Sequence, residues 1–129
     1  MANIGILTER DVESRMRSST KPVVIDFYQA SCPPCRMLEP RLERVAARHH
    51  GVVPVYRVDI DRDLPVAERF GVMSLPTVIV VQNGREVQRL DGLITEHDVA
   101  ATFERIVAHT PARANASASG DAASQVGGS

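Results

Sequence analysis

The segment from Val23 to Pro40 constrains the fold of this chain more than any other. It begins after Pro22 with Val23–Tyr28, a mostly apolar and β-branched run that is typical of a buried strand. It ends in a helical pattern that starts at Cys35. Between the two comes Cys32-Pro33-Pro34-Cys35, which holds the only two cysteines of the chain. The segment therefore predicts a strand, a turn and a helix, with the cysteine pair on the turn.

The first cysteine is expected to be the nucleophile of the pair. If Cys32 is the N-cap of the helix, the backbone N–H of Cys35 and the positive end of the helix dipole both face its sulfur. Both interactions favour the thiolate, which is the reactive form. Cys35 lies one turn inside the helix and is expected to be more buried, which suits a resolving thiol that attacks a mixed disulfide.

Two other roles for the cysteines are a structural disulfide and half of a zinc site. A disulfide across four residues is worth roughly 2 kcal/mol in the chain-entropy model, against roughly 3 for a fifteen-residue ring, so it would constrain little. Zinc requires four ligands, and the four histidines lie on or beside predicted helices without a second paired-ligand motif. We therefore expect redox chemistry and no metal.

The rest of the chain predicts alternating strands and helices. Asn83-Gly84 is a strong signal for a two-residue hairpin turn, because a type I′ turn needs positive φ at both positions. Val99, Phe103, Ile106 and Val107 are expected on the buried face of the last helix. The order predicts an α/β fold, a central mixed β-sheet with helices on both faces. The expected strands are 4–7, 23–28, 55–58, 77–81 and 85–91, and the expected helices are 9–18, 35–49 with a kink at Pro40, 64–70 and one from Thr95.

Length and charge limit the range of partners. A chain of 129 residues predicts one domain, residues 1–109, and the Ala/Ser/Gly-rich residues 110–129 predict a disordered tail. The net charge is −1 without a basic cluster, so neither nucleic acid nor a membrane surface is expected as a partner. The N-terminus lacks a signal-peptide pattern and two close cysteines suit a reducing compartment. We expect a cytoplasmic monomer.

The central segment resembles the thioredoxin family, and the resemblance extends over about residues 4–109. It rests on Asp26 in the strand, on C-P-P-C where the family usually has C-G-P-C, and on Pro40 in the helix. It implies the thioredoxin-like fold and a protein-disulfide reductase that cycles between the Cys32–Cys35 dithiol and disulfide. It also implies disulfide-containing client proteins and a separate thioredoxin reductase as the electron donor. We expect no bound cofactor, since nothing in the sequence predicts a flavin or nicotinamide site.

Further site residues follow from matching the family's motifs. Burial should raise the pKa of Asp26 until its carboxyl can exchange a proton with Cys35 near neutral pH, and the resemblance favours this role over a purely structural one. Arg57 stands where the family often has a lysine, and its fixed charge should oppose that rise. We therefore expect Arg57 to tune the redox properties of the cysteine pair. The same role is expected of Pro33 and Pro34, which lie between the two cysteines.

The expected substrate groove consists of Ser31, Leu75, Pro76 and Gly92. By itself the sequence favours a trans Leu75–Pro76 bond, but the resemblance implies a cis-proline packed against the disulfide, with the backbone of Leu75 pairing with an extended peptide. Ser31 and Tyr28 replace tryptophans of the family, which reduces the apolar surface beside the cysteines. Alternative functions are a disulfide oxidase or isomerase, and a binding module with little redox activity.

Overall fold

The structure is a computed structural model that describes residues 5–6, 11, 14 and 21–109. Most of the predicted helix at 9–18 and the predicted tail at 110–129 lie outside the described residues. The described elements are β1 (Gly5–Ile6), β2 (Val23–Tyr28), α2 (Pro33–Arg48), β3 (Val55–Asp59), α3 (Leu64–Arg69), β4 (Thr77–Gln82), β5 (Arg85–Asp91) and α4 (Glu96–His109). Among these residues, no helix is long and apolar enough to span a bilayer.

The strands of the described chain form one mixed sheet of five strands in the order β1-β3-β2-β4-β5. The central strand β2 pairs in parallel with β3 and antiparallel with β4. Asn83 and Gly84 join β4 to β5 and have φ values of 54° and 78°, as the predicted hairpin turn requires. The predicted α/β class with a mixed sheet is confirmed.

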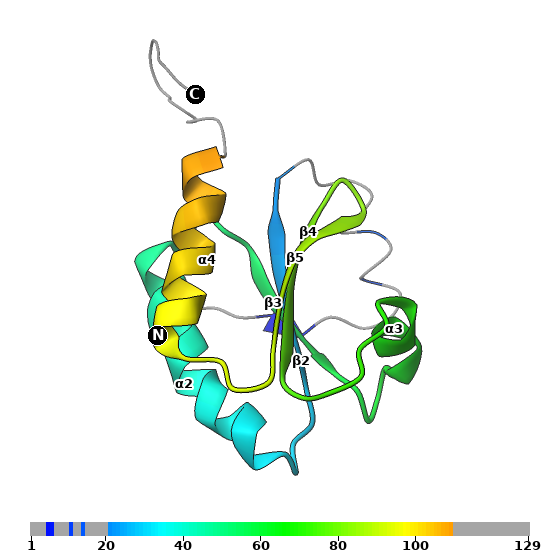
Figure 1. Ribbon diagram of the computed structural model, residues 1–129. Coiled ribbons are helices and arrows are strands. Elements are labelled where there is room, and N and C mark those ends of the chain that lie inside the picture. The colour runs from blue at the N-terminus through cyan, green and yellow to red at the C-terminus, as the bar shows by residue number, and fades with distance from the viewer. Residues whose placement is uncertain (1–4, 7–10, 12–13, 15–20, 110–129) are drawn as a thin grey trace, which may run out of the picture.

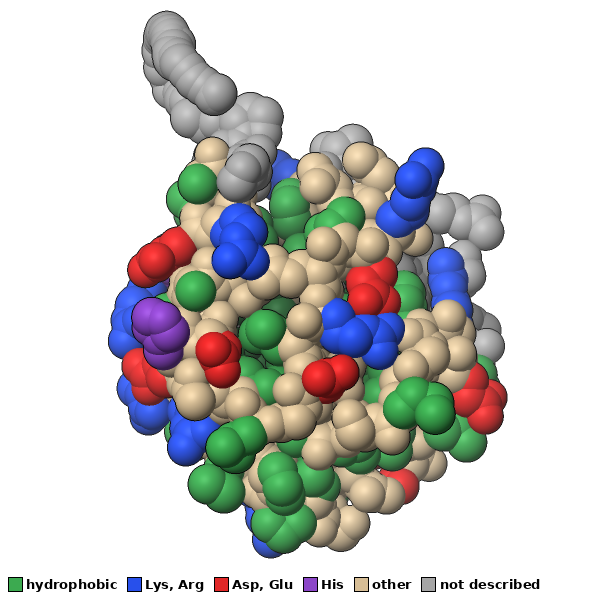
Figure 2. All heavy atoms as spheres, viewed as in Figure 1, with side chains coloured by type: hydrophobic (Ala, Val, Ile, Leu, Met, Phe, Trp, Pro, Cys, Tyr) green, Lys and Arg blue, Asp and Glu red, His purple; other side chains and the backbone are tan. Residues whose placement is uncertain are grey.

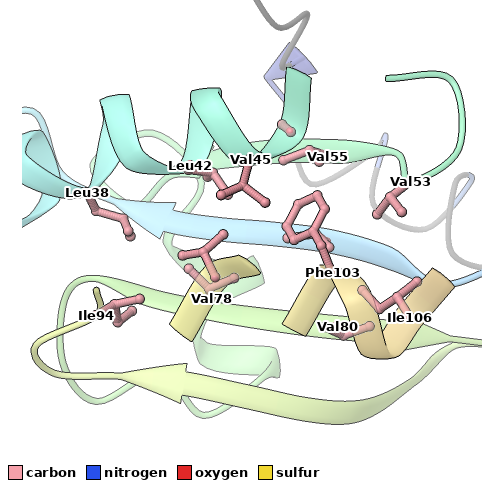
Figure 3. Close-up of a cluster of buried hydrophobic side chains, with 13 residues drawn as sticks. Leu38, Leu42, Val45, Val53, Val55, Val78, Val80, Ile94, Phe103 and Ile106 are labelled. Carbon is pink, nitrogen blue, oxygen red and sulfur yellow. The ribbon is translucent and has the colours of Figure 1, made fainter. Parts of the chain in front are cut away.

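Helices cover both faces of the sheet: α2 and α4 lie on one side, and α3 lies on the other (Figure 1). Successive side chains of β2 point to opposite faces, and helices cover both faces, which explains why the buried residues of this strand other than Asp26 are apolar. Val24 packs under α2 and α4 in the larger of two buried clusters (Figure 3), whereas Val23, Ile25 and Phe27 pack on the α3 side. Asp26 follows Val24 by two residues on the same strand, so its side chain points to the same face of the sheet, toward α2.

Two helices differ in detail from the prediction. α2 begins at Pro33, two residues before the predicted start, because proline is well suited to the first turn of a helix. It continues past Pro40 to Arg48. The expected burial of Val107 in α4 is wrong, since this side chain is exposed. Thr102 is buried instead and accepts a hydrogen bond from Gln88 of β5. The buried face of α4 thus runs through Val99, Thr102, Phe103 and Ile106 and leaves Val107 outside it.

Candidate active site at the start of helix α2

The cysteine pair lies on the turn between β2 and α2, where the chain leaves the sheet. Cys32 is the N-cap of α2, and its backbone is extended, with φ −94° and ψ 109°. The N–H of Cys35 donates to the Sγ of Cys32 over 3.3 Å. The Cys32 N–H in turn donates to the carbonyl of Gln29, which closes the turn before the helix. The predicted N-cap geometry is thus present, with Pro33 and Pro34 in the first two helical positions.

The two thiols lie in different environments. Both cysteines are free in this structure. Cys32 is half-buried, whereas Cys35 is buried. Burial raises the pKa of the Cys35 thiol well above its ordinary value, and its hydrogen bond with Cys32 adds to the rise. Cys35 therefore holds its proton at neutral pH and needs a base before it can attack.

Asp26 supplies a buried carboxyl group on the same side of the sheet. It is 1% exposed, and burial raises the pKa of its carboxyl from 3.8 to about 6 although the charge of Arg57 lowers it. One oxygen, Oδ2, accepts from Nε of Arg57 over 3.2 Å. The other, Oδ1, has no hydrogen-bond partner among the described residues and is the oxygen left to take up a proton. The predicted rise in pKa and the opposing effect of Arg57 are both present.

Arg57 is held in place on three sides. It is the register partner of Asp26 on the neighbouring strand β3. Its Nη1 donates to Oε2 of Glu39 on α2 over 3.1 Å, and its guanidinium carbon lies 3.7 Å from the ring centroid of Tyr28. Stacking on an aromatic face and bonding to carboxylates are both favourable for a planar guanidinium. The guanidinium is thus shared between the buried Asp26 and the more exposed Glu39.

The register of the sheet brings the predicted groove residues to the same end of the molecule. Phe27 of β2 is opposite Thr77 of β4, and Thr77 is opposite Asp91 of β5. Pro76 and Gly92, the next residues out, therefore lie beside the end of β2 that leads to Cys32. The Leu75–Pro76 bond is cis, as the resemblance implied, and Gly92 has φ +76°, which favours glycine.

The surface around this end carries apolar side chains although it lacks tryptophan. Figure 2 shows hydrophobic side chains gathered at the lower end of the molecule, where α2 begins and the chain passes from β5 to α4. The exposed large apolar residues include Met37 on the first turns of α2, Met73 before β4 and Leu93 after Gly92. Ser31, which takes the place of one tryptophan, is exposed beside Cys32, and Leu75 is half-buried. Within the described residues, no group of three or more His, Cys, Asp or Glu side chains is arranged to hold a metal ion.

Glu39 is the site residue that the sequence analysis missed. It stands four positions after Cys35, so the two side chains lie on the same side of α2, one turn apart. That spacing is visible in the sequence and was a usable signal. The partner, Arg57, could not be assigned without knowing that β3 pairs with β2 in the register that sets Arg57 beside Asp26.

The comparisons with known proteins agree with this arrangement. The chain is 38% identical over 101 residues to a thioredoxin of Alicyclobacillus acidocaldarius subsp. acidocaldarius, which is 78% of this chain and 95% of that protein. It is 37% identical over 97 residues to a mitochondrial thioredoxin of Bos taurus, but it spans only 58% of the length of that relative. A mutant thioredoxin from Halobacterium salinarum NRC-1 superposes with a TM-score of 0.72 at 25% identity, covering 85% of this chain and 95% of that one. The Thioredoxin family model matches residues 3–105, and the chain therefore belongs to the thioredoxin family.

Proposed function

We propose that this protein is a thiol–disulfide oxidoreductase that reduces disulfides in client proteins through Cys32 and Cys35. The observation that carries the proposal is the pairing of a half-buried N-cap sulfur with a buried second thiol one turn inside the helix. The positive end of the helix dipole favours negative charge on the Cys32 sulfur. Because Cys32 is only half-buried, this sulfur is accessible to a client disulfide. Membership of a family of protein-disulfide oxidoreductases supports the same conclusion.

The reaction consists of two thiol–disulfide exchanges. The Cys32 thiolate attacks one sulfur of the client disulfide, which forms a mixed disulfide and releases the other client sulfur as a thiolate that takes a proton from water. The Cys35 thiol then gives its proton to the Asp26 carboxylate and attacks the Cys32 sulfur. The second client thiolate leaves and is protonated. Two electrons pass to the client, and the protein is left with a Cys32–Cys35 disulfide.

Asp26 is the proton acceptor in this scheme because it is the buried base beside a thiol that holds its proton. A general base works best when its pKa lies near the operating pH. With a pKa of about 6, Asp26 is largely ionised at pH 7 and still basic enough to accept the proton of Cys35. The end of the sheet formed by Leu75, Pro76 and Gly92 is proposed to bind the client peptide in extended form, with Ser31 and the apolar residues around it as the contact surface.

Regeneration of the dithiol requires an electron donor, which we propose is a separate thioredoxin reductase. A relative from Mycobacterium leprae, 36% identical over 93 residues, carries the name bifunctional thioredoxin reductase/thioredoxin, and this chain matches 20% of its length. Such a cycle suits a reducing compartment, and the cytoplasm is the one that we propose from the sequence.

The test combines an activity assay with trapping of intermediates. The wild-type protein is expected to accelerate the reduction of insulin by dithiothreitol, and Cys32→Ser and Cys35→Ser are each expected to abolish the acceleration. Cys35→Ser should accumulate mixed disulfides with proteins, because no second thiol resolves them, whereas Cys32→Ser should accumulate few. A wild-type protein without activity would favour the binding-module alternative, and equal trapping by both variants would overturn the roles of the two cysteines.

A further inference from the structure

The guanidinium of Arg57 bridges two carboxylates of different exposure. It lies 3.2 Å from Oδ2 of Asp26 and 3.1 Å from Oε2 of Glu39. The side chain of Arg57 is 12% exposed and that of Asp26 is 1% exposed, whereas that of Glu39 is 41% exposed. The bridge therefore runs from the interior of the site to the solvent, with the cation in the middle.

Sharing the cation weakens its pairing with each anion. A lone guanidinium beside a buried carboxylate strongly favours the ionised form and so makes the carboxylate a poorer proton acceptor. Glu39 opposes this in two ways: its charge neutralises part of the Arg57 charge, and it repels the negative charge on Asp26. Both effects favour uptake of a proton by Asp26, and the charge of Glu39 raises the pKa of the Asp26 carboxyl accordingly.

The position of Glu39 also ties the bridge to the reacting thiol. Glu39 is one helical turn beyond Cys35, and α2 is the helix that carries both. Tyr28 stacks on the guanidinium and restricts its movement from the β2 side. The titratable and charged groups that interact with Asp26 are Cys35 and Glu39 from α2, Arg57 from β3 and Tyr28 from its own strand. The neighbouring strand β4 presents Val78 opposite Asp26.

We propose that Glu39 is a positioning residue for proton exchange: it holds one arm of Arg57 toward solvent, prevents a full ion pair between Arg57 and Asp26, and so keeps Asp26 able to accept the proton of Cys35. This inference rests on the proposed function. It assigns to Glu39 an effect on Asp26 that is transmitted by the Arg57 guanidinium.

The main experiment is a carboxyl carbon NMR titration of Asp26 in the reduced protein and in Glu39→Gln. The midpoint is expected to fall by about 0.5–1 pH unit in the variant, because Arg57 then pairs with Asp26 alone. Glu43→Gln is the matched control, since it removes the same charge from the same helix one turn further on. No hydrogen bond or ion pair joins Glu43 to another residue that the structure describes, so the midpoint should not move.

The second readout is the rate at which Cys35 resolves a mixed disulfide between Cys32 and 5-thio-2-nitrobenzoate. In Glu39→Gln the acid limb of the pH–rate profile should shift to lower pH by the same amount as the Asp26 midpoint. The plateau rate should fall by about two- to three-fold, because Asp26 is then a weaker base. An unchanged midpoint in this variant would overturn the proposal. The titration needs no turnover, so an inactive wild type would refute the proposed function and leave the bridge measurable.

A double-mutant cycle separates the bridge from simple repulsion. Lysine is a point charge without a planar fork, so Arg57→Lys should uncouple the two carboxylates and reduce the effect of Glu39→Gln. Equal shifts in both backgrounds would show that Glu39 acts only through space and would overturn the positioning role. If Arg57→Lys does not fold, Glu39→Asp replaces it: keeping the charge on a shorter arm should lower the midpoint if the bridge matters and leave it unchanged if only charge matters.

Discussion

At the residue scale, Asp26 is the point where opposing effects must be compared. Loss of hydration raises the pKa of its carboxyl, and the charge and hydrogen bond of Arg57 lower it. Desolvation is the larger effect, and the result is a pKa of about 6. The sequence predicted the direction of both effects on the pKa. It could not show that Glu39 also pairs with Arg57, which partly neutralises the Arg57 charge and leaves desolvation as the larger effect.

Asp26→Ala is expected to stabilise the fold at pH 7 while slowing turnover. A raised carboxyl pKa means that the native state binds more protons than the unfolded state between about pH 4 and 7, so stability falls as pH rises through that window. A shift of about two units corresponds to about 3 kcal/mol, from which a small cavity and the altered pairing of Arg57 subtract, so a net gain of about 1–2 kcal/mol is expected. Urea unfolding at pH 4 and pH 8 measures the difference.

The gain from Asp26→Ala should be present at pH 8 and absent at pH 4, where Asp26 is neutral in the native protein. Insulin reduction at pH 7 should slow because Cys35 loses its base. A variant that is less stable at pH 8 and turns over at the wild-type rate would show that Asp26 is a structural partner of Arg57 and takes no part in the chemistry.

At the scale of elements, the N-terminus of α2 controls the site. The Cys35 N–H is the third of the helix and the first that is free to bond the N-cap sulfur, because prolines occupy the first two positions. The change from the usual family motif affects only Pro33, in the first position, whose N–H does not face the Cys32 sulfur in an N-cap arrangement. The support for a Cys32 thiolate is therefore the same with proline or glycine at that position.

We therefore expect Pro33→Gly to change the reduction potential by less than about 30 mV, which is about 1.4 kcal/mol for this two-electron couple. Pro34→His should shift the potential further, toward the oxidising side, because a restored N–H and an imidazolium charge both stabilise the thiolate of the reduced form. Equilibration with glutathione measures both potentials. A larger shift for Pro33→Gly than for Pro34→His would contradict the observed role of Cys32 as the N-cap.

At the scale of the whole molecule, the sheet assembles a site from segments that are far apart in the chain. The central strand β2 delivers Cys32, its parallel neighbour β3 supplies Arg57, and its antiparallel neighbour β4 begins directly after Pro76. A hydrophobic cluster between the sheet and helices α2 and α4 holds these elements in register (Figure 3). Arg44 and Arg48 of α2 also pair with Glu96 at the start of α4, which joins the two helices outside that cluster.

Deletion of residues 110–129 is expected to leave the melting temperature within about 2 °C of the full chain and insulin reduction unchanged. The buried face of α4 ends with Ile106, and the residues after His109 are mainly Ala, Ser and Gly, which contribute little apolar area to a core. Calorimetry of both chains tests this. A drop of several degrees or a loss of activity would show that the deleted segment packs on the domain.

Local information in the sequence determined the strands and helices and the position of Cys32 as the N-cap of α2. Continuous apolar runs predicted β2 and β4, because both faces of these strands are buried. The period-3.6 apolar pattern predicted the inner face of α2, because only one side of that helix is buried. The Asn-Gly pair predicted its turn, since positive φ at two successive residues is a local property. N-capping by Cys32 is likewise local, as donor and acceptor are three residues apart.

The tertiary structure alone decided which distant groups share the site. Whether Arg57 pairs with Asp26 only or also with Glu39 depends on the register between β2 and β3 and on the rotation of α2 above them, and packing of the whole core sets both. The rotation of α4, which exposes Val107 and buries Thr102 beside Gln88 of β5, depends in the same way on packing of the core. Charges and hydrogen bonds act over a few ångströms in space, and the sequence separations that they bridge here, 31 residues for Arg57 with Asp26 and 18 for Arg57 with Glu39, carry no local signal.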